Sequence, residues 1–113
     1  MSNLNIYPVG GYITKTIRDL LHLAEPLKIF IVRDLVMASF KGAKVISPKY
    51  FGQDRNVSEK EITDAIDLAE RQGVLQVEYS ENAKGYPQMS VEPTEKCVKA
   101  LQEAKDAASK YIS

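Results

Sequence analysis

The stretch GVLQVEYSENAKGYPQMSVEPTEKC, residues 73–97, carries the pattern that decides the fold. Gly73 stands where a helix would end, since glycine readily takes the left-handed conformation that closes helices. Apolar and polar residues then alternate over 75–79 and again over 89–91, which predicts two strands that each bury one face. The residues of that predicted inner face are Leu75, Val77, Tyr79, Met89 and Val91. Asn82 and Gly85 predict a turn between the strands, and Thr94 is a helix cap, so the stretch predicts a hairpin between two helices.

Two helices are expected directly before this hairpin. Ser47-Pro48 has the composition of an N-cap followed by a first helical residue, which predicts a short helix through about Gly52. A polar turn over 53–57 then leads to Ser58-Glu59-Lys60-Glu61, a capping box that opens a second helix. The second helix is expected to stop at Gly73, with an inner face made of Ile62, Ala65, Ile66 and Ala69.

The first 46 residues predict two further helices and one very short strand. Residues 1–11 are expected to be extended or loose, because Pro8 and Gly10-Gly11 are helix breakers. Apolar residues at helical spacing predict a first helix over about 12–23. Pro26 suits the start of a second helix that runs to about Phe40 and is apolar on nearly all sides, which places it at the centre of the fold. Residues 44–46 can form only a short strand.

The last predicted helix, 94–111, carries a heptad-like stripe. Its members are separated by 4, 3, 4 and 3 residues: Cys97, Leu101, Ala104, Ala108 and Tyr111. One interpretation is a dimer seam, because the small residues let a partner helix approach closely. The other is packing against the chain's own first helix. We favour the dimer seam, because the helix is longer than a small core needs.

Size and composition favour one globular domain over residues 1–113. No apolar run is long enough to span a membrane, and the N-terminus does not resemble a signal peptide. The single cysteine excludes an intrachain disulfide, which fits a cytoplasmic protein. With one histidine, His22, and one cysteine, the chain offers no plausible zinc site or catalytic triad. We therefore expect no enzyme activity, no metal and no cofactor.

The order of these elements resembles a winged helix-turn-helix domain over residues 26–93. Ser47–Gln72 would be the helix-turn-helix pair and Val74–Glu92 the wing. The passage from the hairpin into the last helix further resembles regulators of the MarR and PadR types, with Pro93-Thr94-Glu95-Lys96-Cys97 at the position of a leu-thr-glu-lys-gly pattern and cysteine in place of the usual glycine. The expected fold class is thus α+β, mainly α: a winged helix with an extra N-terminal helix and a long C-terminal helix.

The resemblance implies a small transcriptional regulator that reads double-stranded DNA as a homodimer. In that fold the second helix of the pair enters the major groove, while surrounding side chains contact phosphates. The expected DNA-binding residues are Lys41, Lys44, Lys49, Tyr50, Arg55, Asn56, Lys60, Thr63, Lys84 and Tyr86.

The charge pattern keeps a second function open. The chain has 15 basic and 15 acidic residues, whereas a dedicated nucleic-acid binder more often has a basic excess. Residues 1–57 hold eight bases and four acids, and residues 58–113 hold seven bases and eleven acids. The helix that would read DNA carries five of these acids and only two bases. The alternative is therefore a winged helix that serves as a protein-interaction module, with this acidic helix docked on a basic partner.

Overall fold

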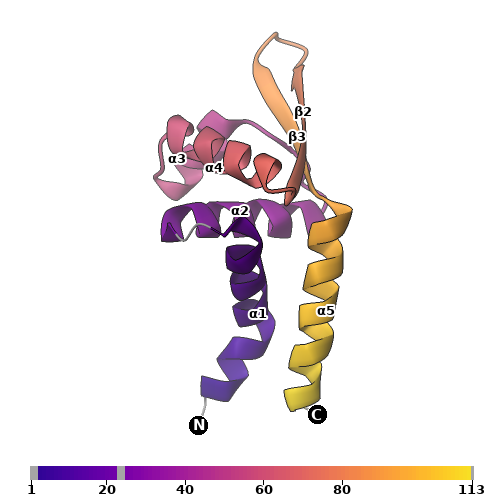
Figure 1. Ribbon diagram of the computed structural model, residues 1–113. Helices are drawn as coiled ribbons and strands as arrows, with labels where there is room; N and C mark the ends of the chain where they lie inside the picture. The colour runs from indigo at the N-terminus through magenta and orange to yellow at the C-terminus, as the bar shows by residue number, and fades with distance from the viewer. Residues whose placement is uncertain (1–2, 23–24, 113) are drawn as a thin grey trace.

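The computed structural model describes residues 3–22 and 25–112 and has five helices and three strands in that part of the chain (Figure 1). In chain order they are α1 (Asn3–Leu21), α2 (Pro26–Phe40), β1 (Val45–Ile46), α3 (Pro48–Arg55), α4 (Glu59–Arg71), β2 (Leu75–Glu81), β3 (Pro87–Pro93) and α5 (Glu95–Ile112). The expected class, α+β and mainly helical, is confirmed.

The strands form one small antiparallel sheet in the order β1-β3-β2. β2 and β3 are paired along their whole length, from Leu75 opposite Pro93 to Glu81 opposite Pro87, whereas β1 adds only a two-residue edge. The far end of the hairpin projects beyond the helices, beside α3 and α4 (Figure 1). Side chains near that end therefore have no layer to cover them.

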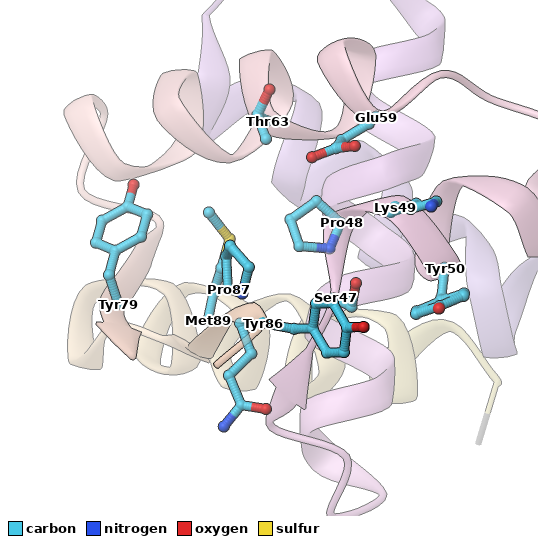
Figure 2. Close-up of a pocket in the computed structure, with 11 residues that line it drawn as sticks. Ser47, Pro48, Lys49, Tyr50, Glu59, Thr63, Tyr79, Tyr86, Pro87 and Met89 are labelled. Carbon is cyan, nitrogen blue, oxygen red and sulfur yellow. The ribbon is translucent and has the colours of Figure 1, made fainter. Parts of the chain in front are cut away.

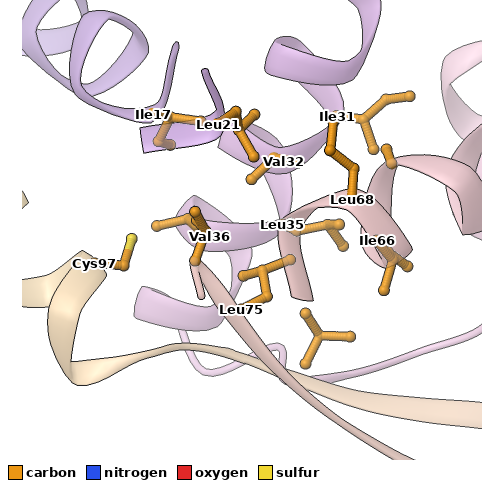
Figure 3. Packing of buried hydrophobic residues seen from close by; sticks show 14 of the residues in the cluster. Ile17, Leu21, Ile31, Val32, Leu35, Val36, Ile66, Leu68, Leu75 and Cys97 are labelled. Carbon is orange, nitrogen blue, oxygen red and sulfur yellow. The ribbon is translucent and has the colours of Figure 1, made fainter. Parts of the chain in front are cut away.

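The hydrophobic core gathers around α2, as its apolar sequence predicted (Figure 3). Val32 and Val36 of this helix are fully buried, and Leu35 is nearly so. α4 contributes the four residues expected on its inner face, Ile62, Ala65, Ile66 and Ala69, all fully buried. Burial of this apolar surface is the main force that holds α4 against α2.

α1 and α5 form an antiparallel pair that extends away from the rest of the molecule (Figure 1). Ile13, Ile17 and Leu21 of α1 are buried in the same core cluster as Cys97 and Leu101 of α5. The chain is consequently elongated, with principal extents of 50 × 28 × 26 Å. We call this pair the stalk.

Local sequence signals account for several helix ends. α2 ends with Gly42 at a φ of 98° and α4 ends with Gly73 at a φ of 73°. After α2, Gly42 N–H donates to Ser39 O at 3.0 Å and Ala43 N–H donates to Ala38 O at 2.8 Å. After α4, Gly73 N–H donates to Glu70 O at 3.1 Å and Val74 N–H donates to Ala69 O at 2.8 Å. This double bonding at a left-handed glycine is the Schellman motif, which satisfies carbonyls that would otherwise lack partners.

The start of α1 differs from the prediction. Residues 3–11 are helical, so Pro8 and Gly10-Gly11 lie inside α1 and do not break it. Each glycine costs a helix only about 1 kcal/mol, and a proline removes a single backbone hydrogen bond in addition to its steric strain. Such a local bias is outweighed when a helix continues from a segment that already packs, as α1 does from Ile13 onward.

Of three smaller expectations, two were wrong and one was confirmed. α3 continues through Arg55, a turn beyond Gly52, because the left-handed residue that ends it is Asn56 with a φ of 58°. Ser47 occupies the N-cap position of α3 and Pro48 the first helical position, as expected, although the Ser47 side chain makes no capping hydrogen bond. Tyr79, predicted to face inward, is 63% exposed because it lies on the projecting part of the hairpin.

Candidate nucleic-acid interface

A groove of about 400 Å³ lies between the hairpin and the pair formed by α3 and α4 (Figure 2). The start of α3 and the residue before it supply one wall with Ser47, Pro48, Lys49 and Tyr50, and α4 supplies another with Glu59 and Thr63. The hairpin side consists of Tyr79, Tyr86, Pro87, Gln88 and Met89. Four predicted DNA-binding residues therefore meet here: Lys49, Tyr50, Thr63 and Tyr86.

The first turn of α4 is held by Ser58. Its hydroxyl accepts a hydrogen bond from the Glu61 amide at 3.1 Å, which is one half of the predicted capping box. The reciprocal bond, from the Ser58 amide to the Glu61 carboxylate, is absent among the hydrogen bonds of the described residues. This cap fixes where α4 begins and so sets the position of Glu59 at the groove.

On the outward face of α4, two residues one helical turn apart form an ion pair. Lys60 Nζ lies 2.8 Å from Asp64 Oδ2. The hydrogen bond with Asp64 raises the pKa of Lys60, and the same bond lowers the pKa of Asp64. Both groups are therefore charged at neutral pH and largely cancel each other's field. Lys60 would have to leave Asp64 before it could contact a phosphate.

Two more predicted DNA-binding cations are engaged within the chain. Lys44 Nζ lies 2.7 Å from Glu92 Oε1 across the sheet. Arg55 Nε lies 3.0 Å from Asp34 Oδ2, and its guanidinium stacks 3.6 Å from the centroid of the Phe51 ring. The two ion pairs join residues 48 and 21 positions apart, so no local sequence pattern predicts them.

Three predicted DNA-binding lysines remain without an ion pair in the described part of the chain: Lys41, Lys49 and Lys84. Lys41 follows α2, Lys49 lies in the first turn of α3, and Lys84 lies at the tip of the hairpin. The Lys49 ammonium is 5.9 Å from the Tyr50 ring centroid, within the range of a cation–π contact. Of the predicted DNA-binding cations, these three could meet a phosphate without breaking an ion pair.

The hairpin tip is organised by Asn82, as the sequence predicted. Its side-chain oxygen accepts from the backbone amides of Lys84 and Tyr86, at 2.9 and 3.0 Å. Its backbone oxygen accepts a hydrogen bond from the amide of Gly85, a residue with a φ of 81°. The tip is thus an ordered turn that presents Lys84 and Tyr86 to solvent.

The predicted dimer stripe lies along the stalk. Cys97 is fully buried and Leu101 nearly so, both within the core of their own chain. The alternative left open by the sequence, packing against the first helix, accounts for these two residues. Ala104 and Ala108 are half-buried, and the side chain of Tyr111 lies outside the described residues. Burial also raises the pKa of Cys97 to about 11, which leaves an unreactive neutral thiol.

Sequence reasoning missed much of the groove lining. Tyr79 and Met89 were assigned to the buried face of the hairpin, Pro87 was assigned to the turn between the strands, and Glu59 was treated as one acid among five. Desolvation raises the pKa of Tyr79, and the nearby charges of Asp67 and Glu70 add to the shift, so this ring faces the acidic side of α4. Nothing in the linear sequence indicates that these residues meet.

Neither a metal cluster nor a helix long and apolar enough to cross a membrane occurs within residues 3–22 and 25–112. No known protein family matches the chain, and no curated protein matches it. The groove and its charges therefore carry the functional argument alone.

Proposed function

We propose that the chain is a winged helix-turn-helix protein that binds double-stranded DNA as a homodimer and regulates transcription. α3 and α4 would form the helix-turn-helix, α4 would enter the major groove, and the β2–β3 hairpin would serve as the wing. The observation that carries the proposal is the solvent-exposed outer face of α4 beside a projecting hairpin, with Lys49 in the first turn of α3 and Lys84 at the hairpin tip.

The charges suit this function only in part. Lys41, Lys49 and Lys84 are available for phosphates, whereas Lys44, Lys60 and Arg55 are engaged with carboxylates. Three phosphate contacts would give a log–log salt slope near −2.7 per chain, from about −0.9 for each phosphate neutralised. We therefore expect weak, salt-sensitive binding to random DNA, on which a dimer would build specificity through two half-sites.

A second candidate function is supported by the remaining acids of α4. Glu59, Glu61, Asp67 and Glu70 have no ion-pair partner among the described residues, so four carboxylates face solvent around one helix. A basic protein segment would complement this surface better than a phosphate backbone does. In this alternative the winged helix is a protein-interaction module.

Fluorescence anisotropy with a random-sequence duplex, at about 50 mM and about 200 mM salt, tests the first function. Wild-type protein should bind at the lower salt and lose much of its affinity at the higher one. Lys49→Gln should weaken binding and reduce the salt slope by about 0.9, because one phosphate contact is lost. Lys105→Gln, an exposed position on the stalk, is the matched control and should change neither quantity.

Acid-neutralising variants separate the two candidates. If DNA is the ligand, Asp67→Asn should strengthen duplex binding, because repulsion from the phosphates falls. If a basic protein is the ligand, duplex binding should be undetectable at the lower salt. A lysine-rich peptide should then bind wild-type protein and bind Asp67→Asn less well. Failure of the duplex to bind at about 50 mM salt contradicts the DNA proposal, since even specific readers keep this electrostatic affinity.

A further inference from the structure

Three tyrosines line the groove, and each is unusually open. Tyr50, Tyr79 and Tyr86 come from α3, β2 and the hairpin tip, and each is 63% exposed. Large aromatic rings are costly to leave in water unless their faces are used, because they present extensive apolar area. Three such rings around one groove, with Pro48, Pro87 and Met89 in the same lining, provide surfaces on which a flat molecule can stack.

The charges around the rings fit a ligand that alternates flat groups with phosphates. The Lys49 ammonium lies over the Tyr50 ring, so a phosphate linked to a stacked group would meet a cation at this wall. Lys84 lies at the tip of the hairpin that forms the other wall. Aromatic rings beside cations are the arrangement by which proteins hold single-stranded nucleic acid: bases stack on the rings and the backbone follows the cations.

An intact duplex cannot use these rings. Its base faces are covered by neighbouring base pairs, and only base edges and the backbone are accessible in the grooves. Ring-to-base stacking requires an unpaired base. We propose that the groove between α4 and the hairpin binds single-stranded DNA, with unpaired bases stacked on Tyr79 and Tyr86 and a neighbouring phosphate held by Lys49.

Glu59 gives this site a base preference. Its carboxylate lies in the groove on the α4 side, near Thr63 and Pro48 (Figure 2). A carboxylate accepts a hydrogen bond from an exocyclic amino group such as N4 of cytosine, whereas thymine carries the acceptor O4 at the same position, which cannot donate to it. The groove therefore favours cytosine over thymine. Such binding goes beyond the duplex binding proposed above, because it uses ring faces in place of phosphate contacts alone.

The chain allows a direct test, because it has no tryptophan and its intrinsic emission comes from its six tyrosines. Oligo(dC) and oligo(dT) of about eight nucleotides, within the usual site size of one such module, are titrated at about 50 mM salt. Labelled oligonucleotide anisotropy and quenching of tyrosine emission are followed together. Oligo(dC) should bind more tightly than oligo(dT), and binding should quench the emission.

Matched variants at the exposed rings isolate stacking. Tyr79→Leu and Tyr86→Leu should each weaken oligo(dC) binding by roughly 5- to 100-fold, the usual effect of losing one stacked ring. Tyr86→Phe retains the ring face and should bind nearly as wild type, which also controls for folding. Glu59→Gln should raise the affinity for oligo(dT) and so reduce the preference for oligo(dC) over oligo(dT), because the amide carries no charge and can donate to O4.

Several results would overturn the single-strand site: no binding of oligo(dC) at the lower salt, equal binding by the leucine variants, or a preference for oligo(dT). Oligocytidine RNA that binds more than tenfold more tightly than oligo(dC) would overturn the choice of DNA. If a lysine-rich peptide quenches the tyrosine emission while oligo(dC) does not bind, the ligand is a protein and the single-strand site is refuted. Duplex binding without oligo(dC) binding refutes only this site, and oligo(dC) binding without duplex binding refutes only the duplex function.

Discussion

Two serines show how far a single residue determines local structure. Ser47 and Ser58 both occupy N-cap positions in extended backbone, with ψ angles of 120° and 154°. Only the Ser58 hydroxyl accepts a backbone amide, that of Glu61 at 3.1 Å. α3 begins instead with Pro48, whose missing N–H lowers the need for a cap. The side chain of Ser47 lines the groove.

The two serines should therefore respond differently to the same substitution. Ser58→Ala should lower the free energy of unfolding by about 1 kcal/mol, because the Glu61 amide loses its acceptor. Ser47→Ala should change it by less than about 0.5 kcal/mol, the usual range for a surface substitution without a specific contact. Urea denaturation followed by circular dichroism measures both. Equal losses would show that the Ser47 hydroxyl also caps its helix in solution.

At the scale of elements, the contact between α3 and α4 depends on Gly52. This residue is buried in the middle of α3, where glycine is otherwise a poor helix former. A Cβ there would overlap the carbonyl oxygen of Val57 and approach Cγ1 of Ile62 to 3.3 Å. The absence of a side chain lets the end of the connecting loop and the first turn of α4 lie directly against α3. Gly52 thus sets the position of one wall of the groove.

Gly52→Ala should destabilise the protein, although the same change in an exposed helix stabilises it by about 1 kcal/mol. The expected loss is about 1–3 kcal/mol, because a backbone carbonyl cannot move aside as a side-chain end can. Gln53→Ala, at the neighbouring exposed position of α3, is the control and should be neutral or slightly stabilising. Thermal and urea unfolding report both changes. A stabilised Gly52→Ala variant would mean that α3 and α4 are less closely packed than described.

The whole molecule is shaped by the stalk, in which α1 and α5 pack as antiparallel neighbours (Figure 1). Cys97 and Leu101 join α5 to the core, whereas Ala104 and Ala108 are only half-buried. A dimer formed through the stalk would therefore use the part of the stripe farther from the core. Leu101→Glu cannot test it, because a charge at that buried position would unfold the chain itself.

Ala108→Glu is the variant that tests the dimer. Light scattering of wild-type protein at micromolar concentration should give about twice the 12.6 kDa mass of the chain. Ala108→Glu should shift the mass toward one chain, because a charge would enter the seam, while the circular dichroism spectrum stays unchanged. Ser109→Glu supplies a neighbouring charge for comparison. A wild-type mass of one chain would contradict the homodimer.

The sequence by itself determined the elements whose causes are local. The bounds of α2 follow from Pro26 and Gly42, those of α4 from Ser58 and Gly73, and the hairpin from alternation around Asn82. These signals act through hydrogen bonds and side-chain spacing within a few residues, so they can be read along the chain. At Pro8 in α1, residue propensity was the only signal, and it gave the wrong helix start. The few kcal/mol by which proline and glycine disfavour a helix are outweighed when the helix continues from a segment that already packs.

Only the tertiary structure decided which surface side chains are paired, exposed or brought together. It paired Lys44 with Glu92 and Arg55 with Asp34, exposed Tyr79, and brought the tyrosines of three separate elements to one groove. It also buried Cys97 and Leu101 in the core of their own chain. Each of these depends on which distant residues meet once α2 is buried, and the energies of such contacts arise from the packed arrangement, which the spacing of residues along the chain does not specify.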